Sequence, residues 1–220
     1  MNVILADLAP GPPIKGAVFI PCDVTSQDQV DALAAAAQAR FGPIHILCNN
    51  AGISAGGQPI WQTPAADWDR LLEVNLNGVL HGIRAFVPGM IRHNEPAHIV
   101  NTASLAGLVP LPGAAAYGVS KRAVIALSEA LRLELLQANA PIGVSVLCPA
   151  AVATSIADSS PDPNLRAVIA AGMAPEQVAE YTLAAIRDNR FWILPHDATL
   201  PVQDRYAQDL LARNAPGFYF

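Results

Sequence analysis

The chain has 220 residues, of which 52% are hydrophobic and 14% are charged, and its formal net charge is −5. Because an average protein carries about 25% charged residues, this composition is that of a core-rich domain and excludes an intrinsically disordered chain. The mild negative charge without a Lys/Arg cluster argues against a nucleic-acid partner, and no apolar run reaches the ~18 residues of a membrane helix.

Short apolar runs rich in β-formers alternate with longer helical patterns along the chain. The predicted strands are residues 3–8, 17–22, 44–48, 98–102, 143–148 and 191–194. The predicted helices are residues 26–41, 67–90, 119–138 and 176–187. This alternation predicts one α/β domain over residues 1–220, with a doubly wound parallel sheet and helices on both faces.

Local signals mark the ends of several elements. Ser26 and Gln29 have the spacing of a capping box, and Gly42 is a typical residue at a helix C-terminus. Residues 9–13 are rich in proline and predict a turn. Residues 155–175 contain Ser-Ser-Pro-Asp-Pro and predict a loop that forms a lid over the ligand.

The three cysteines, Cys22, Cys48 and Cys148, are far apart in the sequence and odd in number. They form neither a disulfide framework nor a metal-binding motif, and no metal site is predicted. The first residues contain no basic segment, so no signal peptide is predicted. A reducing cytoplasm is the location that fits these features best.

The sharpest motif is Tyr117-Gly-Val-Ser-Lys121, because its spacing of four residues places Tyr117 and Lys121 on one face of a helix. An ammonium close to a phenol lowers the pKa of the phenol, so the pair could act as a general acid/base near neutral pH. The Ser104 hydroxyl, after the strand at 98–102, could hydrogen-bond a carbonyl or alkoxide oxygen held against Tyr117. Taken alone, a Tyr/Lys pair at this spacing is also common on solvated helices.

The motifs that accompany this pair favour a functional role for it. Ser104, Tyr117 and Lys121 occur in order with Asp23-Val24, Asn49-Asn50-Ala51-Gly52, Asn75 and Pro149-Ala150-Ala151-Val152-Ala153-Thr154. In this combination the sequence resembles the short-chain dehydrogenase/reductase family over residues 1 to about 200. The resemblance implies a Rossmann-like fold and a nicotinamide cofactor. It also implies that Tyr117 is the acid/base, that Lys121 lowers the pKa of Tyr117 and holds the nicotinamide ribose, and that Ser104 positions the substrate oxygen.

The resemblance implies roles for further residues. Asn75 would support a water-mediated proton relay, and Asp23 and Val24 would contact adenine. The backbone of Asn50, Ala51 and Gly52 would approach the cofactor. Val152 and Thr154 would contact its carboxamide and phosphate.

Asp7 ends the first predicted strand. An acid at this place accepts the ribose hydroxyls of NAD and repels the 2′-phosphate of NADP, so NAD is the predicted cofactor; the alternative is a simple turn residue at a strand end.

The sequence departs from the family pattern at two places. The glycine-rich loop between a first strand and a first helix is missing, together with that strand and helix, and Ala150 stands where the family usually has glycine. In the family's sheet order the missing strand is central, so residues 3–8 and 17–22 would lack a neighbour. Three explanations stay open: the sequence is N-terminally truncated, the two half-sheets pair directly, or the protein has given up its dinucleotide.

These observations predict an oxidoreductase that moves hydride between NAD(H) and a moderately hydrophobic secondary alcohol or ketone, because the residues expected near the pocket are apolar. Those residues are Ile53, Leu105, Ala106, Leu108, Val109 and Ile156. Binding of the cofactor is expected to be weak or lost without the glycine-rich loop. The alternatives are a cofactor-independent hydrolase or lyase that reuses Ser104 or Tyr117, and a non-catalytic remnant. By resemblance, the predicted partners are a small-molecule substrate and a second copy of the chain in a homodimer or homotetramer.

Overall fold

The computed structural model describes residues 1–158, 160 and 162–219, and its strands form two separate parallel sheets. Strands β1 (Val3–Asp7) and β2 (Ala17–Pro21) pair as a two-stranded ribbon. The larger sheet has the order β3-β4-β5-β6, and its strands are Ile46–Asn49, Ala97–Thr102, Ile142–Leu147 and Trp192–Ile193. Each predicted strand is present, with ends that move by one or two residues.

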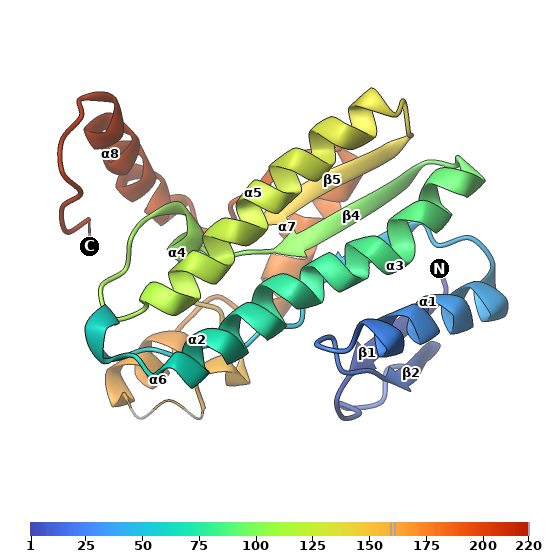
Figure 1. The fold of residues 1–220 in the computed structure, drawn as a ribbon, viewed down its shortest axis with the longest axis horizontal. Helices are drawn as coiled ribbons and strands as arrows, with labels where there is room; N and C mark the ends of the chain where they lie inside the picture. The colour runs from blue at the N-terminus through green and yellow to red at the C-terminus, as the bar shows by residue number, and fades with distance from the viewer. Residues whose placement is uncertain (159, 161, 220) are drawn as a thin grey trace.

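Helices connect and cover the strands (Figure 1). The longer ones are α1 (Gln27–Phe41), α3 (Gly78–His93), α5 (Ala115–Gln137), α7 (Pro175–Arg187) and α8 (Leu200–Leu211). The shorter α-helices are α2 (Ala65–Leu72), α4 (Leu105–Leu108) and α6 (Pro163–Ala170). Single turns form η1 (Ile60–Gln62), η2 (Glu73–Asn77), η3 (Ser155–Ala157) and η4 (Asp197–Thr199).

The larger sheet lies between two helical layers (Figure 1). Helices α3 and α5 lie on one face, and α7 lies behind the other. Buried side chains such as Met90, Ile99 and Leu131 fill the first interface, while Val178 and Ala185 of α7 pack on Ile193 in the second. The predicted α/β, Rossmann-like class with parallel strands and helices on both faces is therefore confirmed.

The ribbon and the larger sheet are not joined by strand pairing. The alternative in which the two half-sheets close the gap by pairing directly is therefore wrong for this structure. Among the residues that the structure describes, strand β3 pairs with β4 alone, so its other edge carries no strand. On this strand Ile46 and Cys48 are exposed, whereas Leu47 packs into the core. A free parallel edge with exposed apolar side chains marks the place where the sheet is interrupted.

The helix predicted over residues 67–90 is not uniform. It consists of α2, the π-helical turn η2 and α3, and in the middle the amide of Gly78 donates to the carbonyl of Glu73. That bond spans five residues rather than four, which inserts an extra residue into the turn. The turn directs Asn75 into the interior, where it is fully buried.

At α1 the cap at Ser26 and the helix end at Gly42 are confirmed, but the capping box is only half formed, because the Gln29 side chain accepts from the amide of Asp23 instead of that of Ser26. The Ser26 hydroxyl accepts a hydrogen bond from the amide of Gln29, and Gly42 ends the helix with φ 78°, a conformation that favours glycine. In contrast, α5 begins four residues earlier than predicted, so that Tyr117 lies in its first turn. The helix ends one residue earlier than predicted.

The segment predicted as a lid, residues 155–175, contains η3 and α6. Residues 159 and 161 of this segment lie outside the described residues. Just beyond α6, Met173 forms a β-bridge with Val152, so the end of the segment is attached to the loop after β5. Its role as a lid stays a prediction.

A buried histidine predicts how stability depends on pH. His98 of β4 donates from Nε2 to the Ser145 hydroxyl at 2.7 Å, and that hydroxyl donates to the carbonyl of Arg190 at 2.6 Å. Burial, followed by the charge of Arg132, lowers the pKa of His98 below its ordinary 6.5. The unfolded chain then binds the extra proton, so the free energy of unfolding should fall as the pH drops below about 6.5.

The measurement is denaturant unfolding of the wild type and of His98→Gln at several pH values from about 7 to about 5. Glutamine keeps a donor for Ser145 but does not titrate, so its free energy of unfolding should fall less over this range. Parallel profiles for the two proteins would contradict the prediction.

Candidate active site

Ser104 and Tyr117 come from the ends of neighbouring elements. Ser104 lies two residues after the end of β4 and caps α4, where its hydroxyl accepts from the amide of Ala106 at 3.2 Å. The same hydroxyl lies 3.4 Å from the carbonyl oxygen of Pro149, to which it can donate. Tyr117 lies in the first turn of α5. The structure therefore brings the predicted serine to the loop that follows β5, at the carboxyl edge of the sheet.

Lys121 lies one turn after Tyr117 and is buried, with 2% of its surface exposed. Its ammonium donates to the carbonyl of Thr102 at 2.9 Å and lies 5.8 Å from the centre of the Tyr117 ring. Burial lowers the pKa of Lys121 to about 8, against a smaller opposite effect of Cys148. One of the three ammonium protons is thus used by the backbone, which leaves two for a ligand.

The pKa of Tyr117 is raised, and the cause is burial of its phenol. The Ser104 hydroxyl beside it acts in the opposite direction but is the smaller effect. Sequence reasoning expected the ammonium of Lys121 to lower this pKa. In the structure burial outweighs any such effect, so the neutral phenol is the favoured form, and lowering by Lys121 stays a prediction.

Asn75 joins three segments through its side chain. Its Oδ1 accepts from the amide of Ile53 at 2.8 Å, and its Nδ2 donates to the carbonyl of Ile53 at 3.0 Å and to the Ser120 hydroxyl at 3.1 Å. The Ser120 hydroxyl donates in turn to the carbonyl of Tyr117. The asparagine is therefore coupled to the first turn of α5, which carries the tyrosine. The sequence contained no signal for this role of Ser120.

The segment after β3 approaches the same place closely. A Cβ atom on Gly52 would lie 3.3 Å from both Oδ1 of Asn75 and Nζ of Lys121. The absence of a side chain thus leaves room beside the lysine. Asn50 accepts from the Thr102 hydroxyl at 3.0 Å, which fixes the strand end. Ala51 links these two residues. The predicted Asn-Ala-Gly motif and Lys121 are therefore neighbours.

The predicted adenosine-binding residues lie on the ribbon side. Asp23 accepts from the amide and the hydroxyl of Thr25, and these bonds lower the pKa of its carboxyl. Val24 packs against Gly78, where a Cβ would lie 2.9 Å from Cγ2 of Val24, and its carbonyl bonds Nδ1 of His81. These contacts hold the segment after β2 against the start of α3.

Asp7 ends β1, and its carboxylate accepts from the amide of Leu8 at 2.7 Å. The carbonyl of Asp7 accepts from the amide of Cys22, which aligns the ends of the two strands. Asp7 is exposed, so its carboxylate is available to a ligand.

The loop after β5 carries the last predicted residues. Val152 bridges Met173, and the Thr154 hydroxyl contacts the carbonyl of Val152 at 3.4 Å. Ala150 is the residue that departs from the family pattern, and its amide donates to Nδ1 of His196 at 3.2 Å. The sequence motifs did not single out His196. No sequence pattern could have identified it, since the contact spans 46 residues.

A cavity of about 280 Å³ lies beside Asn75 and Gly52. It is lined by Gly52, Ile53, Ser54, Ala55, Asp67, Arg70, Leu71, Ser155 and Ile156. The predicted apolar residues Ile53 and Ile156 are among them. Leu105, Ala106 and Val109 are buried and, like Leu108, do not line this cavity, so their place near the substrate pocket stays a prediction. Asp67 and Arg70 on α2 add polar groups that the sequence did not indicate.

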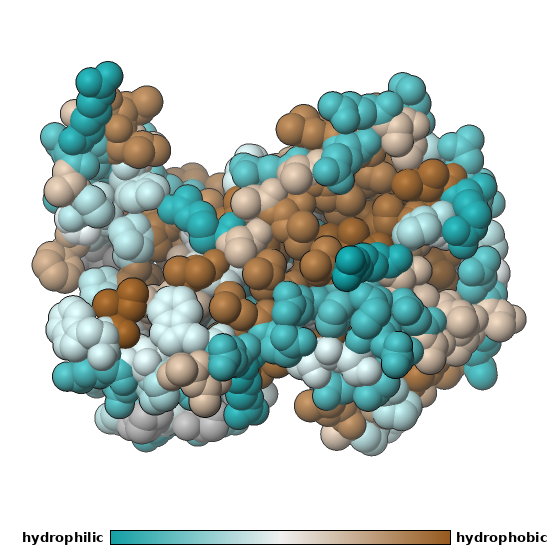
Figure 2. Space-filling model, viewed as in Figure 1, coloured by the Kyte–Doolittle hydropathy of each residue, from teal (hydrophilic) through white to brown (hydrophobic). Residues whose placement is uncertain are grey.

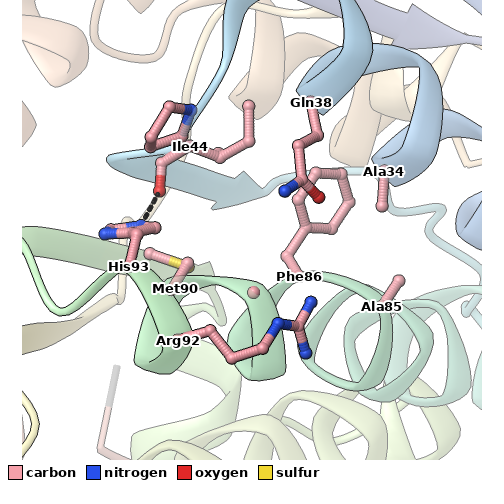
Figure 3. Close-up of a pocket in the computed structure, with 10 residues that line it drawn as sticks. Ala34, Gln38, Ile44, Ala85, Phe86, Met90, Arg92 and His93 are labelled. Carbon is pink, nitrogen blue, oxygen red and sulfur yellow. Dashed lines mark hydrogen bonds between the residues drawn. The ribbon is translucent and has the colours of Figure 1, made fainter.

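A second cavity of about 270 Å³ lies between α1 and α3 (Figure 3). Ala34 and Gln38 face Phe86 and Met90 across it, and His93 bonds the carbonyl of Ile44 at 3.1 Å. Because Ile44 precedes β3, this cavity lies at the amino end of the strand. It contains none of the predicted site residues.

Two general features of the described residues bear on function. Within residues 1–158, 160 and 162–219, no group of three or more His, Cys, Asp or Glu side chains is placed to hold a metal ion. In the same part of the chain, every helix is too short or too polar to cross a lipid bilayer.

Known proteins resemble this chain over most of its length. The family model for "short chain dehydrogenase" matches residues 12–164. A CLA biosynthesis dehydrogenase/reductase of Lactiplantibacillus plantarum is 33% identical, over 92% of this chain and 79% of the relative. A 1-deoxy-11-beta-hydroxypentalenate dehydrogenase of Streptomyces arenae is 35% identical, over 85% of this chain and 67% of the relative.

Solved structures agree with these relatives. The structure of a short chain dehydrogenase/reductase from Burkholderia phymatum in complex with NAD is 38% identical. It superposes with a TM-score of 0.88, over 92% of this chain and 79% of that one. Three findings indicate the same family: the family model, the relatives, and the arrangement of Ser104, Tyr117 and Lys121. The chain belongs to the short-chain dehydrogenase family, whose members are oxidoreductases.

Proposed function

We propose that the protein transfers hydride between NAD(H) and a moderately hydrophobic secondary alcohol or ketone. The observation that carries this proposal is the placement of Ser104, Tyr117 and Lys121 at the ends of β4 and α5, with Asn75 tied to the same turn. A hydrolase has no evident need for a buried ammonium with two free protons next to a tyrosine.

Each residue has a distinct part in the proposed reduction. Tyr117 donates its phenolic proton to the carbonyl oxygen of the substrate, and Ser104 donates a hydrogen bond to the same oxygen. The raised pKa of Tyr117 keeps this proton in place before the reaction. Lys121 binds the ribose hydroxyls, and Asn75 holds the first turn of α5. The nicotinamide, when bound, supplies or accepts the hydride.

The residues of the structure fit one end of the cofactor better than its middle. Gly52 leaves room beside Lys121, which has two unused protons for the ribose next to the nicotinamide. Asp7, Asp23 and Val24 can face the adenosine. Within the described part of the chain, no glycine-rich turn joins a strand to a helix N-terminus, which is the usual pyrophosphate site. We therefore expect weak cofactor binding by these 220 residues.

The cavity beside Asn75 supports the proposed class of substrate. Ile53, Leu71 and Ile156 offer an apolar surface for a carbon skeleton. Asp67 and Arg70 lie at the same cavity and can bind a polar group of the substrate.

The first test is reduction of a panel of aliphatic and aromatic ketones with NADH, followed by the loss of NADH absorbance. Consumption of NADH that depends on the ketone would support the proposal. Hydrolysis of small esters or lactones without any cofactor, lost in both Ser104→Ala and Tyr117→Phe, together with absent NADH binding, would favour the hydrolase instead. Hydrolysis unaffected by both substitutions would place that activity elsewhere.

Asp7 predicts the choice between the two nicotinamide cofactors. Its exposed carboxylate should repel a 2′-phosphate, so NADH should bind more tightly than NADPH. Asp7→Asn removes the charge and should shift the ratio of the two dissociation constants toward NADPH by roughly tenfold. Fluorescence titration with both nucleotides measures this ratio, with Asp69→Asn on α2 as the control. Equal binding of NADPH and NADH by the wild type would contradict the proposal that Asp7 repels the 2′-phosphate.

We also propose that the chain forms homodimers or homotetramers through α3 and α5. Exposed apolar side chains on these helices include Ile91, Val119, Leu133 and Leu136. Figure 2 shows apolar residues gathered over the groove between the two helices. Light scattering of the protein tests this proposal.

The three free cysteines support the further proposal of a reducing, cytoplasmic location.

A further inference from the structure

The loop after β5 is held by contacts from several directions. The carbonyl of Pro149 accepts from the amide of Leu105 at 2.8 Å, and the carbonyl of Ala151 accepts from the amide of Met173 at 3.0 Å. On the third side lies the half-buried His196, just beyond β6. Its Nδ1 accepts from the amide of Ala150 at 3.2 Å, and its Nε2 lies 3.0 Å from the carbonyl of Ala151. One imidazole thus bonds two successive residues of the loop.

These two contacts define the protonation state of His196. The amide of Ala150 can only donate and the carbonyl of Ala151 can only accept. The imidazole must therefore carry its proton on Nε2 and a lone pair on Nδ1. In the other neutral tautomer two donors would meet at Nδ1 and two acceptors at Nε2. A doubly protonated ring would also point a donor at the amide of Ala150. Only the neutral ring with the proton on Nε2 satisfies both contacts.

The side chain of His196 is not required for the turn that it precedes. The first turn of η4 is closed by the backbone: the carbonyl of His196 accepts from the amide of Thr199 at 2.9 Å and from its hydroxyl at 2.7 Å. The imidazole is therefore free to act on the loop. The bonds reach from residue 196 to residues 150 and 151, and they connect the C-terminal segment to the loop that also contacts Ser104 through Pro149.

We propose that His196 is a positioning residue that clamps the peptide between Ala150 and Ala151 and so sets the conformation of the loop through Val152 and Thr154. This inference rests on the proposed function, because the clamped loop is the one that would contact the nicotinamide end of the cofactor. The clamp occupies the amide of Ala150 and the carbonyl of Ala151. Within the described residues, the amides of Ala151, Val152 and Thr154 have no hydrogen-bond partner in the protein, so the clamped loop keeps donors for a ligand.

The clamp can be observed directly without any activity. Nitrogen-15 NMR of the histidine side chains at neutral pH should show His196 as the neutral ring protonated on Nε2. The amide of Ala150 should exchange slowly with solvent in the wild type and faster in His196→Leu. A ring protonated on Nδ1, or an exchange rate of Ala150 that does not change in the variant, would overturn the clamp.

The role in binding is tested with two ligands, NADH and ADP-ribose, which lacks the nicotinamide. His196→Leu removes both bonds and should weaken NADH binding about tenfold, while ADP-ribose binding should stay as in the wild type. His196→Gln keeps one acceptor and a donor in a single amide group. It should restore NADH binding to within about threefold of the wild type, and it covers the case in which the leucine variant does not fold.

The outcomes separate the inference from the proposed function. Equal losses of NADH and ADP-ribose binding in His196→Leu would show a general structural role and overturn the inference, as would unchanged NADH binding. If the wild type binds neither ligand, the proposed function fails, whereas the tautomer of His196 still decides whether the clamp exists. His45→Gln, an exposed histidine far along the chain, is the matched control and should leave both affinities unchanged.

Discussion

Tyr117→Phe should reduce turnover of ketones by roughly 10²- to 10⁴-fold, the usual contribution of a positioned general acid. The variant loses only the phenolic oxygen, because phenylalanine fills the same space in the first turn of α5. Since the ribose contacts are assigned to Lys121, binding of NADH should change little. The measurement is steady-state reduction by NADH, together with titration of NADH into the variant.

The control for this prediction is Tyr181→Phe, because Tyr181 is an exposed tyrosine on α7, remote from Ser104 in the chain. It should behave as the wild type. Ketone reduction at the wild-type rate in Tyr117→Phe would remove Tyr117 from the role of acid. A loss of NADH binding equal to the loss of turnover would instead mean that the phenol acts mainly in binding.

Lys121→Met should weaken NADH binding by roughly 10- to 100-fold, the range expected for a lost charge-assisted hydrogen bond, and should reduce turnover as well. Methionine keeps most of the volume of the buried stem but has no ammonium. Lys121→Ala should harm both properties too, with an added cavity at a site that is 2% exposed. Titration with NADH and steady-state kinetics on the same preparation separate the two effects.

The pKa of Lys121 gives this prediction a pH dependence. Burial lowers that pKa from 10.5 to about 8, so NADH affinity of the wild type should decline as the pH rises through about 8 and the ammonium is lost. The free energy of unfolding changes with pH in the opposite direction to the NADH affinity. The unfolded chain binds the proton more tightly, so the contribution of Lys121 to the free energy of unfolding rises from about pH 8 to pH 10.5.

Lys121→Met should lack both effects, and Lys15→Met, on the turn before β2, is the control. If Lys121→Met lost NADH binding at alkaline pH to the same extent as the wild type, the titrating group would be a residue other than Lys121. If the free energy of unfolding changed with pH in the same way in the wild type and in Lys121→Met, the folded state would not lower the pKa of Lys121.

The sequence by itself determined the features that depend on neighbours along the chain. The cap at Ser26, the helix end at Gly42 and the shared helical face of Tyr117 and Lys121 follow from spacing alone, because their partners lie within a few residues. The alternation of strands and helices was likewise enough for the parallel α/β class. The order of the motifs was enough for the family, which the comparisons confirm.

Tertiary structure alone decided what depends on contacts between distant segments. It divided the strands into a ribbon and a four-stranded sheet, since pairing of strands is not encoded in either strand separately. It placed the extra residue of the π-helical turn that buries Asn75, because that turn is stabilised by bonds to Ile53 and Ser120. It also raised the pKa of Tyr117, since the chain spacing specifies the distance to Lys121 but not the extent of burial. The bonds of His196 to a loop 46 residues earlier exist only once β5 and β6 lie side by side.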